Sequence, residues 1–410
     1  MLSVLKRLWS LLTRKEVLSV FLMVFVADVV VGIFSPTFSL FATSLGASVT
    51  LIGVLSSVRG LTRTLTSIPV GMVSDSSGRR IVLLGGMLLL SGSAFLYSLV
   101  SSPYALLPLR MITGVVISAT FFIGMAYMGD QVPREDRGLA SGVYTSCMGL
   151  GFTVGSALGG GLAASAGYIV TFRVAAAFAL VGFLVAWWGL AKPADKGLSV
   201  EAAETPLARL GLLAREPQLL AASLGYLLII LMFDAAVVNF FPLYAAGALA
   251  IGQTAIGSMM AVRALVSTSV RMPTGMLSTR IASRHLMVTA LIIGMLMMLT
   301  ICCVNSPTIL TLVLAGEGVC FGMYLTAGQA FVTENFAQSE RGTAMGVYSM
   351  TGSIGSTAGP FVMGAVGDLL GLRSVFVMTG ILVFVGILVF LYASSRPSPA
   401  ESLLNGGDTG

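Results

Sequence analysis

The two halves of this 410-residue chain repeat each other, and the repeat includes charged residues within long apolar stretches. The separation is 204 positions along most of the chain and 206 positions at the first apolar stretch. A biased apolar composition readily matches Gly with Gly or Val with Val, but it rarely matches Asp, Arg and Pro. The matched charged residues and prolines are Asp28/Asp234, Pro36/Pro242, Arg59/Arg263, Pro69/Pro273 and Arg137/Arg341. The sequence therefore predicts two parts of similar fold.

The composition indicates that both parts lie in a membrane. Hydrophobic residues make up 56% of the chain and charged residues 10%, and the mean hydropathy is +0.96. Such a chain is too apolar for a soluble protein of this size. A spanning helix takes about 20 residues. Twelve stretches of suitable length and polarity lie at 17–42, 49–73, 81–101, 105–129, 140–164, 169–191, 218–244, 253–278, 285–304, 308–333, 343–366 and 373–393. The predicted fold is an all-α membrane protein with two pseudo-symmetric six-helix bundles.

Polar stretches and basic residues predict the domain boundaries and the orientation. We expect a cytoplasmic N-terminal segment (1–16), bundles at 17–191 and 218–393, a cytoplasmic connector (192–217) and a disordered tail (394–410). Lys and Arg concentrate in the loops on one side, which predicts a multi-pass protein of the cell membrane with both termini in the cytoplasm. The net charge of +6 then reflects topology and predicts no nucleic-acid partner.

The loop after the second stretch has the pattern G-x-x-x-D-x-x-G-R-R, formed by Gly71, Asp75, Gly78, Arg79 and Arg80. It resembles the signature loop of the major facilitator superfamily (MFS), and the resemblance implies the MFS fold. It further implies that Asp75 faces the start of the eleventh helix, where the helix dipole favours an anion. Arg79 or Arg80 is expected to pair with Asp130 at the end of the fourth helix, as parts of one gate. In the second half Thr279 replaces the acid, and Glu334 is the mate of Asp130.

Two further stretches resemble the same superfamily. The glycines of the fifth stretch follow the spacing of its antiporter motif, at Gly142, Gly151, Gly155, Gly159 and Gly160. Ser156 stands where the family has proline, and close packing of gating helices is an equal explanation of the glycines. Arg110 and Gly114 form an R-x-x-x-G arrangement similar to the one that the family associates with proton coupling. Together these motifs resemble the proton-coupled drug antiporter branch.

Charged side chains in the middle of membrane helices are functional candidates, because they are costly unless they face a wet cavity or a partner. They are Asp28, Asp234, Glu317, Arg59, Arg63, Arg110, Arg263 and Arg271. Asp28 lies about ten residues into the first stretch, near the midplane at about 1.5 Å per residue. We predict that Asp28 carries a proton, whose affinity depends on burial and on a nearby arginine, either Arg110 or Arg59. The alternative is a permanently ionised Asp28 in a structural ion pair. Asp234 and Glu317 complete the proton-coupling candidates.

The arginines have two possible roles. Arg59 and Arg63 are four residues apart and share a helix face, and Arg263 repeats the first of them. Arginines on the second and eighth helices can clamp an anionic substrate from both halves, or serve as counterions to the three acids. Arg271, nearer a helix end, is expected to be structural. Residues at similar depth that suit an amphipathic ligand, or core packing, are Tyr144, Asn239, Tyr244, Tyr324, Gln329 and Tyr348.

No motif of catalysis is present in the sequence: it has no P-loop, no nucleophile elbow and a single histidine. We therefore predict no enzyme activity and no cofactor or metal. The leading hypothesis is a secondary active transporter that exports amphipathic small molecules or drugs by proton antiport and alternating access. An organic-anion or metabolite carrier with paired arginines is the alternative, and a non-transporting receptor is a third. The expected partners are a small-molecule substrate, protons and the lipid bilayer, and we expect a monomer.

Overall fold

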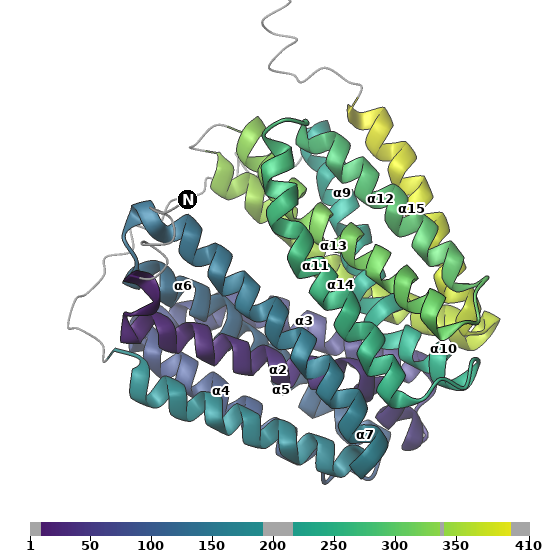
Figure 1. The fold of residues 1–410 in the computed structure, drawn as a ribbon, viewed down its shortest axis with the longest axis horizontal. Helices are drawn as coiled ribbons and strands as arrows, with labels where there is room; N and C mark the ends of the chain where they lie inside the picture. Colours follow the sequence, from purple (N-terminus) through teal and green to yellow (C-terminus); the bar gives the residue numbers. More distant parts are fainter. Residues whose placement is uncertain (1–9, 192–215, 337–339, 395–410) are drawn as a thin grey trace, which may run out of the picture. The chain divides into compact units, whose positions relative to one another are not determined.

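The computed structural model describes residues 10–191, 216–336 and 340–394. Figure 1 shows the order of the helices by colour. The first repeat contains α2 (Lys15–Ser44), α3 (Val49–Ser77), α4 (Arg79–Tyr97), η1 (Pro103–Ala105), α5 (Leu106–Ile117), η2 (Ser118–Phe122), α6 (Ile123–Gln131), η3 (Arg134–Asp136) and α7 (Arg137–Gly189). The second repeat contains α9 (Pro217–Leu231), η4 (Met232–Phe240), α10 (Phe241–Gly247), α11 (Gln253–Ser278), α12 (Ser283–Ile301), α13 (Pro307–Asn335), α14 (Arg341–Leu370) and α15 (Leu372–Ser394). The described residues contain no β-strand, so the predicted all-α class is confirmed.

All twelve predicted spans fall on helices. Each matches one helix or one continuous run of helices to within four residues, apart from the fifth and sixth spans, which share α7. Gly167 separates these two spans, because its φ of +79° and ψ of 171° interrupt the helix. A side chain would strain this backbone conformation, which glycine adopts readily. The turn between the fifth and sixth spans therefore depends on glycine.

Eight helices or helix runs of the described part are long and apolar enough to cross a membrane by length and composition. α7 counts once although it holds two predicted spans. α3, α11 and α14 are absent from this set. α3 and α11 carry Arg59 and Arg263 together with several Ser and Thr residues, which lower their mean hydropathy. Two of the three spans outside the set therefore carry candidate arginines.

Contacts between Cα atoms divide the chain into two compact units. The first unit comprises the described residues up to 191 together with Phe241–Leu265, and the second comprises 216–240 and the described residues from Val266 on. Most of the predicted N-terminal segment, connector and tail lies outside the described residues. The predicted boundaries of the two bundles therefore stay a prediction.

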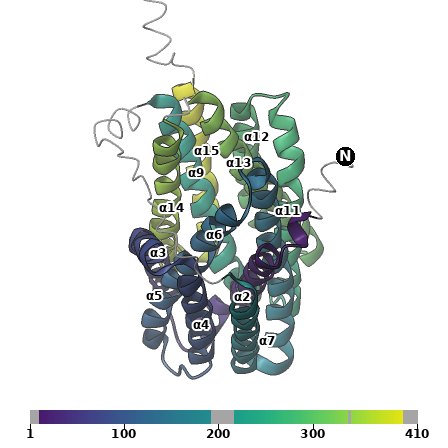
Figure 2. The same ribbon diagram turned by 90° about the vertical axis from the view of Figure 1, so that its left-hand side faces the viewer.

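Glycines allow α7 to pack directly against the backbone of α2, and the two helices lie side by side in Figure 2. A Cβ atom on Gly151, Gly155 or Gly159 would come within 2.3, 2.1 and 2.5 Å of the carbonyl oxygens of residues 25, 29 and 33. No side chain fits at such distances. Small residues of this kind let membrane helices approach closely, because lipid supplies no hydrophobic drive between them.

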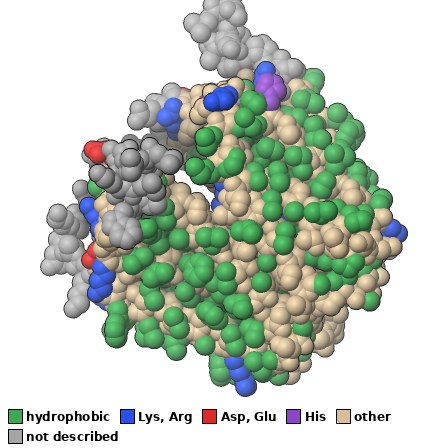
Figure 3. Space-filling model, viewed as in Figure 1, with side chains coloured by type: hydrophobic (Ala, Val, Ile, Leu, Met, Phe, Trp, Pro, Cys, Tyr) green, Lys and Arg blue, Asp and Glu red, His purple; other side chains and the backbone are tan. Residues whose placement is uncertain are grey.

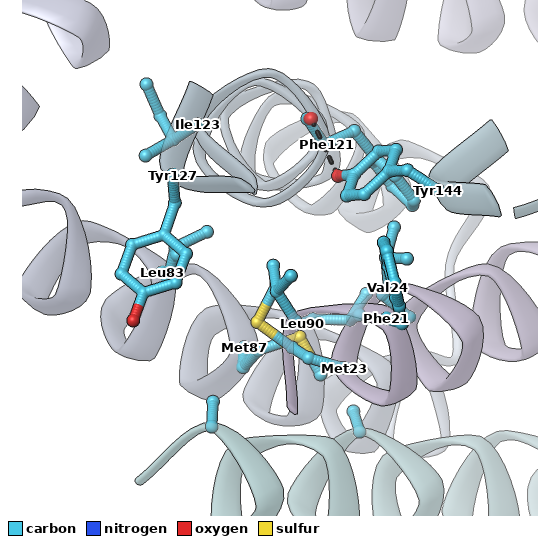
Figure 4. Packing of buried hydrophobic residues seen from close by; sticks show 14 of the residues in the cluster. Phe21, Met23, Val24, Leu83, Met87, Leu90, Phe121, Ile123, Tyr127 and Tyr144 are labelled. Carbon is cyan, nitrogen blue, oxygen red and sulfur yellow. Dashed lines mark hydrogen bonds between the residues drawn. The ribbon is translucent and has the colours of Figure 1, made fainter. Parts of the chain in front are cut away.

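The first unit has an apolar core between α2, α4, α6 and α7. Figure 4 shows Phe21, Met23, Met87 and Leu90 packed together near Tyr144. The outer surface is apolar as well, and Figure 3 shows hydrophobic side chains spread over one face. Large exposed examples are Leu65, Ile68, Met72, Trp188 and Leu369. An apolar exterior of this extent suits a protein whose solvent is lipid.

Candidate functional site

The signature loop places Arg79 and Asp130 together, as the sequence predicts. Gly78 joins α3 to α4 with a φ of +89°, a conformation that favours glycine. Arg79 then begins α4, and its Nε lies 2.8 Å from Oδ2 of Asp130 near the end of α6. Both side chains are partly exposed, so the pair contributes at most about 1 kcal/mol. Its position between α4 and α6 is more informative than its strength.

Arg80 makes a second connection from the same turn. Its Nη2 donates to the backbone carbonyl of Trp187 at 2.7 Å, and its guanidinium lies 5.7 Å from the centre of the Trp187 ring. The start of α4 is thereby tied to the end of α7. Asp75 is exposed near the end of α3. Gly71 has open space where a Cβ would lie, so packing of the described atoms does not require glycine there.

In the second repeat, a different pair of residues connects the equivalent helix ends. Ser283 begins α12 at the position of Arg79, and its hydroxyl donates to Oε2 of Glu334 at 2.9 Å. The turn before it contains Ala282, whose φ of −53° any residue adopts. Glu334 is the repeat mate of Asp130. A neutral hydrogen-bond donor therefore replaces the guanidinium at equivalent helix ends.

Asp28 is buried inside the first unit. It lies near the middle of the 30-residue helix α2, and only 7% of its surface is exposed. A Cβ atom on Gly151 would come within 3.1 Å of the Asp28 Cβ, so the Asp28 side chain starts at one of the close contacts between α7 and α2. Tyr144, on the same helix as Gly151, lies within electrostatic range of Asp28. The Asp28 side chain therefore lies at the interface of α2 with α7.

Arg110 comes from α5, and its guanidinium contacts residues of α2 and α3. Its guanidinium carbon is 3.1 Å from the centre of the Phe38 ring, and its Nη2 donates to the Ser56 hydroxyl at 3.5 Å. Phe38 follows Asp28 by ten residues on one helix, which corresponds to about 15 Å at the rise of an α-helix. The ring contact therefore holds the guanidinium near the Ser44 end of α2, whereas Asp28 lies near its middle.

Arg59 and Arg63 lie on a stretch of α3 whose backbone packs against α5 and η2. A Cβ on Gly114 would come within 2.6 Å of the Arg59 carbonyl oxygen, and the Ser118 hydroxyl donates to the Arg63 carbonyl at 2.9 Å. The second repeat keeps this crossing, since a Cβ on Gly322 would meet the Ser267 carbonyl oxygen at 2.3 Å. Gly322 is the repeat mate of Ser118 and Ser267 that of Arg63, each at a separation of 204 residues.

The charged residues predicted within the helices differ in their degree of burial. The sequence predicts three acids against five arginines within the helices. Among the described residues, the fully buried charged side chains are Asp28, Asp234 and Glu317 with Arg110 and Arg263. Arg59, Arg63 and Arg271 are half-buried. The fully buried set therefore contains more acids than bases, and the predicted positive excess rests on three side chains that keep partial exposure.

Asp234 and Asn239 share a distorted helical segment. Both belong to η4, a π-helical stretch between α9 and α10, and both are buried. The amide nitrogen of the Asn239 side chain donates to the backbone carbonyl of Asp234. A π-helix changes the usual backbone pairing, and such segments often occur at functional sites. The repeat mate Asp28 lies instead on a regular α-helix.

Asp234 also differs from Asp28 in its position along the neighbouring helix, which is α14 for Asp234 and α7 for Asp28. In the first unit, Gly155 packs on the backbone of Val29; in the second, Gly359, its 204-residue mate, packs on Leu231. Helix packing thus pairs positions 202 apart, whereas the sequence pairs Asp28 with Asp234 at 206. The difference of four residues is close to one turn, or about 6 Å. Asp234 is therefore one turn beyond the packing equivalent of Asp28.

The candidate tyrosines fill helix interfaces. Tyr144 donates to the Phe121 carbonyl at 2.9 Å, shown in Figure 4, and Tyr324 donates to the Ala222 carbonyl at 2.8 Å. Tyr348 stacks on Tyr226 with ring centres 4.4 Å apart. All four lie within helices, and the three candidates among them are nearly or fully buried. Their contacts favour the packing interpretation over a ligand-binding one.

Two motif glycines behave differently from the α2-facing set. Gly142 has open space around the position of a Cβ. Gly160 faces α11 within the first unit, where a Cβ would come within 2.7 Å of the Gly257 Cα. Nearby, the Gln253 amide donates to the Tyr168 hydroxyl at 2.5 Å. Sequence reasoning missed Gln253, Tyr168 and Phe38, because polar or aromatic residues at these positions form no recognisable pattern.

These features define a duplicated helical carrier with acids and arginines buried inside its bundles. The sequence matches the family described as Major Facilitator Superfamily over residues 20–248 and 224–409. The chain belongs to this superfamily, and it is a multi-pass membrane transporter rather than an enzyme.

Curated relatives align over most of the chain. An uncharacterized MFS-type transporter of Methanocaldococcus jannaschii is 24% identical over 92% of this chain and 98% of its own length. Multidrug resistance protein MdtG of Dickeya zeae is 25% identical, covering 85% of this chain and 86% of that protein. Multidrug resistance protein 1 of Bacillus subtilis is 26% identical, covering 84% and 88%.

Solved structures show the same fold. A bacterial homologue of the human lysosomal transporter Spinster, in an inward-facing and occupied conformation, superimposes with a TM-score of 0.78 at 16% identity, over 96% of this chain and 99% of that chain. The human organic anion transporter MFSD10 gives a TM-score of 0.62 at 21% identity, over 92% and 99%. The predicted MFS fold is thereby confirmed.

Proposed function

We propose that this transporter is a proton-coupled antiporter that exports amphipathic small molecules by alternating access. The observation that carries the proposal is the burial of Asp28 in the middle of α2, with 7% of its surface exposed. A carboxyl buried in a membrane helix is costly unless it serves an ion, proton or substrate pathway. The names of two relatives, both multidrug resistance proteins, support drugs as substrates.

In the proposed cycle, Asp28 takes up a proton on one side of the membrane and releases it on the other, while substrate moves in the opposite direction. Asp234, Glu317 and Arg110 belong to the same coupling system as buried charges. Arg59, Arg63, Arg263 and Asn239 are the proposed substrate contacts. The pair Arg79–Asp130 connects α4 to α6 and serves as part of the gate.

The proposal is tested in proteoliposomes with an imposed pH gradient and with ethidium and Hoechst 33342 as amphipathic probes. Wild-type protein is expected to concentrate at least one dye against its gradient. Asp28→Asn is expected to lose this uphill transport but to keep energy-independent exchange. Glu16→Gln, in the first turn of the same helix, is the matched control and keeps uphill transport. Uphill transport in Asp28→Asn at the wild-type rate contradicts the proposal.

An organic-anion carrier is the second candidate. Arg263 is 2% exposed, and a buried guanidinium is suited to bidentate binding of a carboxylate. The similarity to MFSD10, named an organic anion transporter, is in keeping with this candidate at the level of fold. With fluorescein as the anionic probe, Arg59→Gln and Arg263→Gln are each expected to weaken binding at least tenfold. Wild-type affinity in both variants excludes an arginine clamp.

We also propose that the protein is a monomer of the cell membrane with both termini in the cytoplasm. The excess of Lys and Arg in the loops on one side supports this orientation. Reporter fusions at the two termini test it, because a reporter active only in the cytoplasm is expected to work at both ends. Activity at only one terminus contradicts an even number of spans.

A further inference from the structure

An aromatic cluster occupies one end of the first unit. Phe34 lies 4.9 Å from Tyr97 and 5.0 Å from Phe172, and Phe172 lies 4.9 Å from Phe41, between ring centres. Phe38 meets the Tyr97 ring edge-on at 6.3 Å and 89°. The rings come from α2, α4 and α7, so the cluster joins three helices. Tyr97 and Phe172 are fully buried, and Phe38 is 3% exposed.

Arg110 inserts a charge into this apolar surrounding from α5. Its guanidinium carbon lies over the Phe38 ring at 3.1 Å from the centre, well inside the range of about 6 Å for a cation–π contact. Arg110 is 5% exposed, so water covers little of its charge. Desolvation strengthens attraction between a cation and the negative face of a ring. Phe38 is therefore placed to stabilise a buried guanidinium.

The position of the Phe38 ring is itself restricted by a neighbouring ring. Tyr97 packs edge-on against Phe38, which restricts rotation of the phenyl ring. On the cation, Ser56 accepts a hydrogen bond from Nη2 at 3.5 Å, and Ser56 is fully buried. A long Arg side chain has many rotamers, and an anchored ring plus a hydrogen bond restricts them. These two contacts restrict the guanidinium beside the Phe38 ring.

We propose that Phe38 is the positioning residue for Arg110, which it holds near the Ser44 end of α2 through a cation–π contact. The role in transport rests on the proposed function above, in which Arg110 takes part in proton coupling. The contact itself does not depend on that function. Phe38 touches neither substrate nor proton in this account, and it acts only through Arg110.

The test replaces Phe38 with phenylalanines that carry one, two and three ring fluorines, introduced by nonsense suppression. Fluorine withdraws charge from the ring face with little change in shape, so packing stays nearly constant while cation binding weakens. Phe34 is the matched control, because it lies four residues away on α2 and in the same cluster. Among the described residues its ring contacts are with Tyr97 and Phe172 only. The measurements are Tm and proton-driven dye transport, each in the wild-type and Arg110→Met backgrounds.

At Phe38, Tm is expected to fall stepwise with each fluorine, by a few degrees in total. The fall is expected to vanish in the Arg110→Met background, and the Phe34 series is expected to be flat in both. Equal effects at the two positions, or a fall that persists in Arg110→Met, overturn the proposal. A positioning role also predicts that the transport rate falls in parallel with Tm only in the Phe38 series. If wild-type protein shows no proton-driven transport while the Tm pattern holds, the proposed function fails and the positioning of Arg110 stands.

Discussion

In the first repeat, Arg79 pairs with Asp130 at 2.8 Å, whereas 204 residues later Ser283 donates to Glu334 at 2.9 Å. The two contacts join equivalent helix ends and have nearly the same length. One uses two charges and the other a neutral donor. The two repeats therefore share the geometry of these helix ends but differ in the charge of the groups that meet there. A gate built on charge is thus expected to be stronger in the first repeat.

The helix distortions are divided between the repeats in the same way. The first repeat has its π-helical segment at Ser118–Phe122, in the fourth span, and the second has it at Met232–Phe240, in the seventh. The equivalent spans are regular: α13 matches the fourth span and α2 the seventh. Each half therefore departs from regular helix at a different place. Asp234 acquires its altered backbone environment from this difference, and Asp28 does not.

The largest expected effect comes from Gly155, where a Cβ would lie 2.1 Å from the Val29 carbonyl oxygen. Backbone cannot yield there, so Gly155→Ala is expected to destabilise the protein by several kcal/mol. Gly359→Ala meets the Leu231 side chain at 2.9 Å, which can adjust, and its effect is expected to be smaller. Gly142→Ala is the control, with open space. Thermal unfolding in detergent measures the Tm of all three variants. An equal fall in Tm for Gly155→Ala and Gly359→Ala contradicts the predicted difference between the repeats.

Tyr144 and Tyr348 give the next contrast. Tyr144 donates to the Phe121 carbonyl, whereas the Tyr348 hydroxyl has no hydrogen-bond partner among the described residues. Tyr144→Phe leaves a buried carbonyl without its donor and is expected to lose about 1–3 kcal/mol. Tyr348→Phe is expected to be neutral or slightly stabilising. Chemical unfolding monitored by tryptophan fluorescence compares them, and a larger loss in Tyr348→Phe refutes the assignment.

The smallest expected effect tests the helix-end contacts directly. Ser283 is the repeat mate of Arg79 and contacts Glu334, so Ser283→Arg introduces into the second repeat the arginine that the first repeat has. Ser283 is buried, so an arginine there has to extend to the exposed Glu334. The resulting ion pair at the exposed carboxylate is expected to add at most about 1 kcal/mol, and less at high salt. The matched change is Arg79→Ser, which removes the pair with Asp130. Thermal unfolding at low and high salt reports both, and a gain independent of salt contradicts an electrostatic origin.

Much of the helical fold was predictable from the sequence, because the repeat, the hydropathy and the loop motif are visible in short stretches of residues. The pairing of Arg79 with Asp130 followed from the loop motif and is confirmed. The four-residue displacement of Asp234 was not predictable. A slip of about one turn leaves the same helix face toward the neighbour, so the hydrophobic pattern does not record it. The contacts of the interface glycines, such as Gly155 and Gly359, reveal it.

The environment of Arg110 was equally hidden. The sequence singled out Arg110 by its R-x-x-x-G motif, but nothing in the motif indicated that the guanidinium lies on the Phe38 ring. One phenylalanine in a chain with 22 of them carries no signal of its own. Its role arises from a contact between α2 and α5, which lie 72 positions apart at Phe38 and Arg110. Long-range pairing of this kind is decided by packing and leaves no periodic trace.

The central claim is that Asp28 exchanges a proton, and infrared difference spectroscopy across a pH titration tests it without any substrate. A protonated buried carboxyl has a C=O band that disappears on ionisation. The account predicts a titrating band in wild-type protein and in Asp234→Asn that is absent from Asp28→Asn. A titrating band that is unchanged by Asp28→Asn, or the lack of any titrating carboxyl in wild-type protein, would contradict it.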